Sequence, residues 1–568
     1  MMFAHAYSMS IVRLSLYGMG LTMAAFVFIL ANGIPGGAIF WNLLWADIPA
    51  ALLMLVFLLF AHWYGEQVED DANRVERMLR LLDDRRYVVA FVLWVILCAC
   101  ALWVYRNHPL SMDEYAAVFQ ARIFAAGALH GQLPPDLLDY LIPPLFQHGF
   151  LRVNPETGAV FSGYWPGFSL LLAPFVWLGI PWAGNPAIVV ASLLLIARIA
   201  RDLAVSPQAA GWAMLFALAS PAFVANGISY YSMPAHLLFN LVFVWLLLKP
   251  SPVRLVLAGL AGGFSLALHQ PFPHAVFALP WIVWLAAQRG RVRNLSLLAS
   301  GYLPVFLLLV VGWLLWRQDI LRVGVHAAVA ADMGSGMTLI DRAMGMLRGF
   351  LGLLHWPNEP IIYARLAGLA KLWLWASPLL LLLAWWGARG EKRPGIRLLG
   401  ASALLTFFAY FLIEFDQGHG WGYRYFHSAW GVLPVLAALG VIKLSGEGPR
   451  VFRQVALLAM LSLLALNALR LVQMGEFMQA HLAQSPPRVE ASGRKIYMHY
   501  GRGYYALDLI QNDPWMRGDE VVLLVRNKAD VQRVLEYFPG ARQVADNQYG
   551  ITAVQTDPGW MSRDDRPD

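Results

Sequence analysis

The sequence has few charged residues for its length. Only 14% of its 568 residues are Asp, Glu, Lys or Arg, whereas about 25% is usual in soluble domains. Apolar residues make up 59% of the chain, and the mean hydropathy is +0.55. A water-soluble core has no room for that much apolar surface, which excludes a soluble cytosolic enzyme and a disordered chain. The sequence therefore predicts an integral membrane protein.

Cysteine is nearly absent. The two cysteines, Cys98 and Cys100, lie in one apolar run, so a disulfide-stapled secreted scaffold is excluded as well. The formal net charge is +7, from 42 basic and 35 acidic residues. Most of the basic residues lie in short loops between apolar runs, where they indicate membrane topology. We therefore expect no nucleic-acid partner.

Apolar runs long enough to cross a bilayer recur along the chain. By the usual length of about 20 residues per span, the sequence predicts about thirteen transmembrane helices. They lie near residues 9–31, 38–62, 88–105, 185–200, 207–225, 234–249, 254–268, 273–288, 295–315, 367–388, 397–414, 427–443 and 454–472. A further run, 168–180, is shorter and is bounded by Gly167 and Pro181, so we interpret it as an interfacial or re-entrant helix.

Basic residues divide unequally between the two sides of these spans. Nineteen Lys and Arg lie in the loops of one side, at 63–87, 198–206, 249–254, 289–293, 389–397 and 443–453. The short loops of the other side hold Arg424 alone. The positive-inside rule then predicts a multi-pass protein with a cytoplasmic N-terminus. The outer side receives the loops 106–184 and 316–366 and the tail 473–568.

This topology divides the chain into three parts. We expect an N-terminal hairpin with a cytosolic loop (1–87), a transmembrane domain (88–472) and an extracytoplasmic C-terminal domain (473–568). Within the tail, residues 520–525 and 550–554 are predicted strands and residues 529–537 a helix. The tail therefore indicates a small α/β domain.

Two adjacent carboxylates, Asp113 and Glu114, follow directly on a predicted span. Ser111 is suited to cap a helix there, with Glu114 completing a capping box. The helix continues through residues 116–129, which are apolar on one side and carry Arg122, so we predict that it lies on the membrane surface. Acidic residues favour a helix N-terminus for structural reasons alone. That interpretation stands beside a catalytic one.

Further motifs follow in order along the chain. They are Gly163–Ser169 (GYWPGFS), a span that ends in Arg198 and Arg201, Ser229–Ser232 before Pro234, and Gly422–Tyr425. With Asp113–Tyr115 and Ala121–Arg122, this order resembles the GT-C glycosyltransferases, in the branch of the lipid A aminoarabinose and protein O-mannosyl transferases. The resemblance covers about residues 88–445. The hairpin 1–87 is an addition to the family pattern, and the turn at Pro166 has one proline and no Lys.

The resemblance implies a GT-C-like fold and an inverting transferase on the outer side of a bacterial inner membrane. Such an enzyme moves a sugar from a polyprenyl-phosphate carrier to a hydroxyl of a glycan, lipid or protein. A sugar–phosphate bond needs little acid assistance, so the site must supply a base and cations. Asp113 is then the base, and Glu114 positions the acceptor or supports a metal.

Candidate contacts to the substrate follow from the same hypothesis. The donor phosphate is expected at Arg424, Arg122, His269 and His274, and the substrate pocket at Tyr115, Tyr164, Trp165, Tyr231, His419 and Tyr423. Each of these residues also has a structural explanation. Arg424 is then a snorkelling anchor and Arg122 the polar face of a helix, and the two histidines lie at the membrane interface. No recognised metal-ligand pattern is present, and a Mg or Mn cofactor is expected, if at all, at Asp113.

Asp47 lies within the predicted span 38–62 and has no assigned role. An intramembrane carboxylate is a functional hypothesis by default, either as a contact to a partner helix or as part of a polar pocket. Two other functions stay open for the chain. A lipid-linked-sugar flippase or transporter requires polar residues along its spans, and in a non-catalytic assembly subunit Asp113 faces no cavity.

Overall fold

The computed structural model describes residues 11–32, 43–67, 72–204, 206–322, 354–415, 417–444 and 449–556, together with residues 345, 348 and 352. Within this part of the chain, seven helices are long and apolar enough to cross a membrane, or up to nine when each of two bent pairs counts as one span. The chain is therefore a polytopic helical membrane protein. Most of the predicted outer loop 316–366 lies outside the described residues.

A helix occupies at least part of each predicted span. The long spans lie in α1 (Ile11–Asn32), α3 (Asp47–Gln67), α5 (Arg86–Trp103), α9 (Gly184–Leu203), α15 (Arg291–Val305) continued through a π-helical segment into α16 (Trp313–Arg322), α21 (Pro394–Ala409), and α24 (Pro449–Leu461) continued into α25 (Asn467–Leu482). The bent pairs are α10 (Ala209–Leu218) with α11 (Pro221–Gly227), and α22 (Arg424–Trp430) with α23 (Val432–Leu444). The total of thirteen stays a prediction.

Several apolar helices are shorter than these long spans. They are α8 (Gly167–Trp177), α12 (Met233–Leu247), α13 (Pro252–Leu266) and α14 (Phe272–Ala286). The predicted span 367–388 is divided between α19 (Glu359–Leu374) and α20 (Leu380–Ala388). Helix α4 (Ala72–Asp84) lies in the predicted cytosolic loop. The short α8 agrees in length with the interfacial or re-entrant helix that the sequence predicts.

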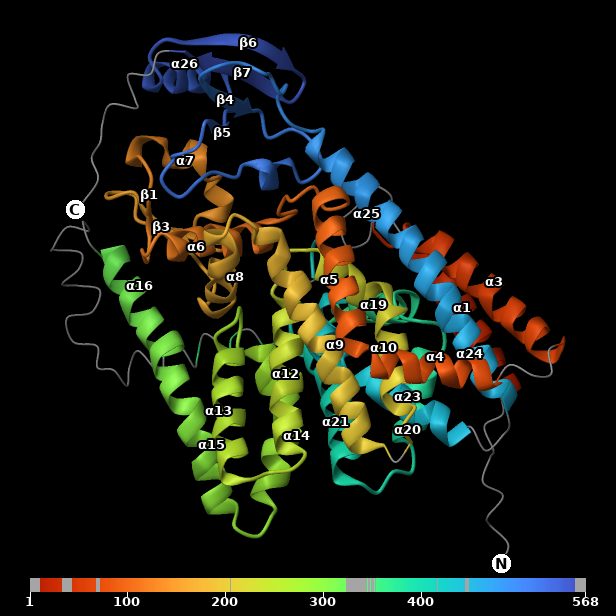
Figure 1. The fold of residues 1–568 in the computed structure, drawn as a ribbon. Coiled ribbons are helices and arrows are strands. Elements are labelled where there is room, and N and C mark those ends of the chain that lie inside the picture. Colours follow the sequence, from red (N-terminus) through yellow and green to blue (C-terminus); the bar gives the residue numbers. More distant parts are fainter. Residues whose placement is uncertain are drawn as a thin grey trace, which may run out of the picture. The chain divides into compact units, whose positions relative to one another are not determined.

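The chain forms two compact units. The first, which we call the helical unit, takes residues 1–104, 182–308 and 337–474. Within it α13, α14 and α15 pack against one another, as Figure 1 shows. Helices α20 and α23 also pack closely, because Gly387 and Gly440 lack side chains where the two backbones meet.

The second unit, which we call the α/β unit, takes residues 105–181, 309–336 and 475–568. Its first segment forms α6 (Met112–Ala125), α7 (Leu138–Leu141) and an antiparallel sheet in the order β1-β3-β2, with β1 Gly131–Gln132, β2 Leu151–Val153 and β3 Ala159–Ser162. Its last segment forms a second sheet in the order β5-β4-β7-β6, with β4 Arg494–His499, β5 Glu520–Leu524, β6 Ala541–Asn547 and β7 Gly550–Gln555.

The second sheet is mixed. Strand β4 pairs in parallel with β5 and antiparallel with β7. Helix α26 (Lys528–Tyr537) lies beside this sheet in Figure 1, and its Val534 belongs to the same hydrophobic core as Ile496 of β4. The strands and the helix predicted in the tail are confirmed to within two residues. The division of the chain into parts at residues 87 and 472 stays a prediction.

One hydrophobic core joins the first predicted outer loop to the tail. It contains Met112 and Phe119 of α6 together with Ile496 and Val521 of the second sheet. The prediction that this helix lies on the membrane surface is wrong, because both sides of α6 are buried and Arg122 is its one exposed residue. The core therefore fixes α6, which carries the candidate carboxylates, against residues of the tail.

Candidate functional site

The first turn of α6 carries both candidate carboxylates. Ser111 occupies the N-cap position, as predicted, but its side chain does not accept the capping hydrogen bond. Instead, Oδ1 of Asp508 accepts a hydrogen bond from the backbone N–H of Met112 at 3.0 Å. Asp508 thereby satisfies one of the backbone donors that a helix N-terminus leaves free.

Glu114 is a buried carboxylate. Its side chain is fully inaccessible to solvent. The Tyr105 hydroxyl donates to Oε1 at 2.9 Å and to Oε2 at 3.2 Å, and the backbone N–H of Leu110 also donates to Oε2. Both oxygens are therefore engaged in holding the turn that precedes α6, which supports a positioning role for Glu114 rather than a direct contact with acceptor or metal.

That turn contains strained backbone. Arg106 and Asn107 adopt φ values of 57° and 49°, a region that residues other than glycine rarely occupy. Such conformations persist only where the surrounding structure enforces them. The hydrogen bonds from Tyr105 and Leu110 to Glu114 span this segment and supply that constraint. The chain thus enters α6 along a fixed path.

Asp113 differs from its neighbour in being partly exposed. The Tyr164 hydroxyl donates a hydrogen bond to Asp113 Oδ1. Tyr164 belongs to the turn after β3, where its own N–H donates to Ser162 Oγ at 3.2 Å. The predicted site residues Asp113 and Tyr164 therefore lie together within the α/β unit.

Trp165 continues the same turn and contacts a cation that sequence reasoning missed. The guanidinium of Arg317, in α16, lies 5.5 Å from the centre of the Trp165 ring. Arg317 Nη1 also donates to the carbonyl oxygen of Gly163 at 3.3 Å. The turn that carries Tyr164 is thus held from one side by Asp113 and from the other by Arg317.

Tyr115 connects α6 to the tail. Its hydroxyl donates to the carbonyl oxygen of Asn512 at 2.6 Å and accepts from the Asn512 N–H at 2.7 Å. Burial raises the pKa of the phenol, so it stays protonated. Gln511 adds a hydrogen bond from Nε2 to the Pro109 carbonyl oxygen at 2.8 Å. The prediction that Tyr115 contacts substrate therefore receives no support from its surroundings.

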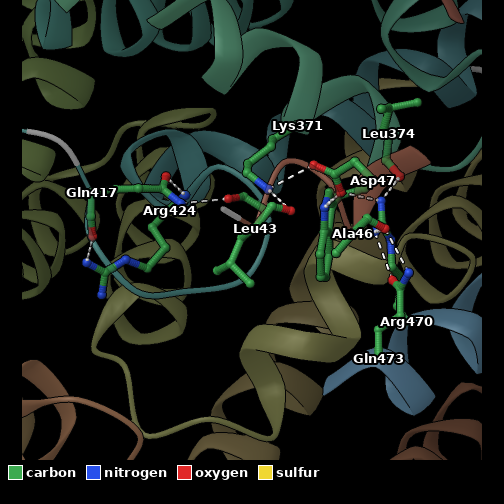
Figure 2. Close-up of polar contacts among 11 residues, drawn as sticks. Leu43, Ala46, Asp47, Lys371, Leu374, Gln417, Arg424, Arg470 and Gln473 are labelled. Atoms are coloured by element: carbon green, nitrogen blue, oxygen red, sulfur yellow. Dashed lines mark hydrogen bonds and ion pairs between the residues drawn. The ribbon is translucent and has the colours of Figure 1, made fainter. Parts of the chain in front are cut away.

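In the helical unit, Arg424 is buried and is the first residue of α22, directly after a glycine-rich loop. Its backbone N–H donates to Gln417 Oε1 at 3.0 Å, and its guanidinium donates to the Gln417 carbonyl oxygen (Figure 2). The guanidinium also stacks over the ring of Tyr231, 4.1 Å from its centre. A snorkelling arginine keeps its charged group in water, whereas the Arg424 guanidinium is buried against an aromatic ring.

The loop from Gln417 to Arg424 depends on glycine. Gly418, Gly420 and Gly422 all have positive φ, and a Cβ on Gly420 would overlap the Arg424 side chain. His419 and Tyr423, two further predicted pocket residues, are buried in this loop. Arg424, Tyr231, His419 and Tyr423 are therefore brought into one part of the helical unit.

The two predicted histidines differ in their surroundings. His274 Nδ1 lies 2.7 Å from Asn240 Oδ1 and its Nε2 lies 2.6 Å from the Tyr302 hydroxyl. Both nitrogens are engaged, so His274 has none left for a phosphate, and its contacts join α14 to α12 and α15. His269 lies in the break between α13 and α14 and stays a candidate contact.

A divalent cation at Asp113 would need further oxygen ligands. Magnesium and manganese prefer several oxygen ligands, and the adjacent carboxylate of Glu114 already accepts hydrogen bonds on both oxygens. In the part of the chain that the structure describes, no group of three or more His, Cys, Asp or Glu side chains is placed to hold a metal ion.

Comparisons with known proteins give similar folds only. The chain is similar to the crystal structure of ArnT from Cupriavidus metallidurans bound to undecaprenyl phosphate, with 13% identity and a TM-score of 0.48 over 83% of this chain and 98% of that chain. The apo structure of the same protein gives 13% identity and a TM-score of 0.45 over the same shares. No family model and no curated protein matches the chain. At this level of likeness, the chemistry must be inferred from the residues of this chain.

Proposed function

We propose that the chain is a GT-C-type glycosyltransferase, which moves a sugar from a polyprenyl-phosphate carrier to an acceptor hydroxyl outside a bacterial plasma membrane. The observation that carries the proposal is the contrast between two adjacent carboxylates. Glu114 is buried and hydrogen-bonded on both oxygens, whereas Asp113 is partly exposed and is oriented through Oδ1 by Tyr164. A base must reach the proton that it removes, so Asp113 takes that role.

In the proposed reaction, Asp113 accepts the proton of the acceptor hydroxyl while the hydroxyl oxygen bonds to the anomeric carbon of the sugar. The bond from that carbon to the phosphate oxygen breaks, and the electron pair leaves with polyprenyl phosphate. One displacement of this kind inverts the anomeric configuration. Base catalysis supplies about 10²–10⁴-fold, and positioning and charge stabilisation supply the rest.

For the departing phosphate we propose Arg424 as the main contact. A guanidinium binds two phosphate oxygens at once, and it keeps its charge when buried. The stacking on Tyr231 and the contacts with Gln417 give Arg424 one orientation. His269 is a second candidate. Arg122 is exposed near the end of α6, so we propose it only as a secondary contact to the phosphate.

The proposed reaction contains no metal step, because the adjacent carboxylate of Glu114 accepts hydrogen bonds on both oxygens. The donor is proposed to be a polyprenyl-phosphate-linked monosaccharide, and the acceptor a glycan, lipid or protein. The N-terminus is proposed to be cytoplasmic and the α/β unit extracytoplasmic, which follows from the charge of the loops.

A flippase or transporter is the alternative that shares the same lipid substrate. Charged residues do lie in the spans, since Asp47, Lys371 and Arg470 are buried in α3, α19 and α25. They form ion pairs with one another, however, and a translocation pathway needs polar groups that a substrate can reach. This pairing favours the transferase.

The two functions separate in one experiment. The purified protein is reconstituted in vesicles and supplied with a panel of polyprenyl-phosphate sugars and an envelope extract as acceptor. We expect one donor to be consumed, with release of polyprenyl phosphate and transfer of its sugar. Movement of labelled donor across the bilayer without consumption of any donor would overturn the transferase and establish the alternative.

A further inference from the structure

Asp47, which the sequence left without a role, lies in a buried charge cluster of the helical unit. Asp47 Oδ2 lies 2.8 Å from Lys371 Nζ, and Oδ1 lies 2.7 Å from Arg470 Nη2. The three side chains are at most 1% exposed. Figure 2 shows them converging from α3, α19 and α25. We call Asp47, Lys371 and Arg470 the Asp47 cluster.

The cluster fixes the turn that leads into α3. Lys371 Nζ donates to the Leu43 carbonyl oxygen at 3.3 Å, and Arg470 Nη1 donates to the Ala46 carbonyl oxygen at 3.0 Å. Gln473 Nε2 donates to the same Ala46 oxygen at 2.7 Å. One carboxylate faces two cations, which leaves a formal charge of +1 that these carbonyl dipoles help to balance. The cluster therefore attaches the added N-terminal hairpin to α19 and α25.

Trp375 joins this cluster to a different part of the helical unit. Its Nε1–H donates to Asp47 Oδ1 at 2.7 Å, and the Arg470 guanidinium stacks over its ring, 4.1 Å from the centre. Trp375 lies in the break between α19 and α20, and its carbonyl oxygen accepts from the Ala222 N–H at 2.8 Å. Trp375 is thus held in three ways, through the ring N–H, the ring face and the backbone carbonyl.

Trp375 also packs against the loop that carries Arg424. A Cβ on Gly422 would lie 3.4 Å from Trp375 Cβ, and the Trp375 and Trp421 rings lie 6.3 Å apart. Gly422 in turn is bound by Gln417, whose Nε2 donates to the Gly422 carbonyl oxygen at 2.9 Å. Gln417 is the residue that orients Arg424.

We infer that Asp47 is a positioning residue for Arg424, acting through Trp375 and the loop of residues 417–424. The inference rests on the proposed function in one respect, since it takes Arg424 to bind the donor phosphate. Its structural part concerns only contacts within the helical unit. On this account the added hairpin 1–87 helps to hold the proposed donor-phosphate contact, Arg424, in place.

The first test uses local structure alone. Trp375→Phe in the full-length protein removes the hydrogen bond to Asp47 and keeps an aromatic ring. Hydrogen exchange of peptides covering residues 417–424 is expected to speed up by about tenfold. Trp373→Phe is the matched control, because Trp373 Nε1–H donates to Thr22 of the same hairpin at 3.0 Å and the variant removes that bond instead of the one to Asp47. Unchanged exchange in Trp375→Phe would overturn the inference.

A second pair of variants addresses Asp47 itself. Asp47→Asn combined with Lys371→Met keeps the formal charge of the cluster at +1 and removes its carboxylate. Exchange of the same peptides is expected to speed up, and adding Trp375→Phe is expected to give no further change. Independent, multiplying effects would contradict a path from Asp47 through Trp375.

The third test asks whether the positioning matters for the donor. Trp375→Phe is expected to raise the donor KM about tenfold with a smaller change in kcat, while Trp373→Phe leaves both unchanged. In an Arg424→Gln background, Trp375→Phe is expected to add nothing, and an equal loss in that background would overturn the inference. A wild-type protein that consumes no donor, with faster loop exchange in Trp375→Phe, would leave the positioning intact and refute the proposed function.

Discussion

The Tyr164 hydroxyl donates a hydrogen bond to Oδ1 of Asp113, across 51 residues of sequence. The tyrosine lies in the turn after β3, and the aspartate lies in the first turn of α6. The bond therefore orients the proposed base from a sheet of the same unit. A hydrogen bond of this kind favours the charged form of a carboxylate, which is the form that a base needs.

Removal of the Tyr164 hydroxyl is expected to leave the proposed base less well oriented without unfolding the protein. Tyr164→Phe should lower kcat about tenfold, because Asp113 loses the hydrogen bond that holds its carboxylate in one orientation. Tyr140→Phe is the matched control, since its hydroxyl donates to Asp530 at 3.4 Å in the same unit. An unchanged kcat for Tyr164→Phe would contradict the role of this contact.

Asp508 is expected to support Asp113 from the tail. Asp508→Ala removes the acceptor for the Met112 N–H and should cost about 0.5–2 kcal/mol of stability, as loss of a helix cap does. It should also lower kcat, because the first turn of α6 loses its anchor.

Asp508→Asn retains an oxygen at the same place and is expected to restore most of the rate. Asp513→Ala, which removes a turn contact to the Trp515 N–H in the same tail, is the control. Equal rates for the alanine and asparagine variants of Asp508 would argue against a positioning role.

These contacts mark the limit of what the sequence predicts. The start of α6 and two of the four tail strands, β5 and β7, follow from local signals, a capping residue and short apolar runs, whereas β4 and β6 were not predicted. The partners of α6 do not, since Asp508 and Asn512 lie 396 and 397 residues away from Met112 and Tyr115. The surface position predicted for α6 failed for the same reason, because residues of the tail complete its core.

The same reasoning applies to Asp47 and Arg424. Each is conspicuous in the sequence, Asp47 as a carboxylate within a predicted span and Arg424 as the single cation in the short loops that are predicted to lie outside. Their partners cannot be identified from the sequence, because residues that are close in the fold are far apart in the chain. Lys371, for example, lies 324 residues from Asp47. Sequence reasoning therefore identified the charged residues that needed partners, and the fold was required to supply the partners.

The α/β unit is expected to lose stability in mild acid through His108. Burial and the nearby Arg488 and Arg122 lower the pKa of this histidine from 6.5 to about 4. As the pH falls from 6.5 towards 4, the unfolded chain binds a proton that the folded chain does not, so stability decreases. Each pH unit is worth about 1.4 kcal/mol, which gives a loss of about 3 kcal/mol over this window.

Thermal unfolding between pH 7.5 and 4.5 checks this expectation. His108→Gln stays neutral throughout and should reduce the decrease in Tm at low pH. His148→Gln, at an exposed position, is the control and should show the same decrease in Tm with pH as wild type. Identical pH profiles for wild type and His108→Gln would refute the assignment.

Removal of divalent cations is expected to leave turnover unchanged. The Glu114 oxygens are engaged by Tyr105 and Leu110, so a cation at Asp113 would lack its adjacent carboxylate. Initial rates are compared with and without EDTA, and again after addition of Mg or Mn. A rate abolished by EDTA and restored by either cation would place a metal in the reaction.

The central claim, that Asp113 is the base, is tested most directly by single-turnover sugar transfer with Asp113→Asn beside Glu114→Gln and wild type. We expect the rate of bound-donor consumption to fall at least about 10²-fold in Asp113→Asn. Glu114→Gln should mainly lower Tm, because its carboxylate holds the turn before α6. A folded Asp113→Asn protein that transfers sugar at the wild-type rate would contradict the account.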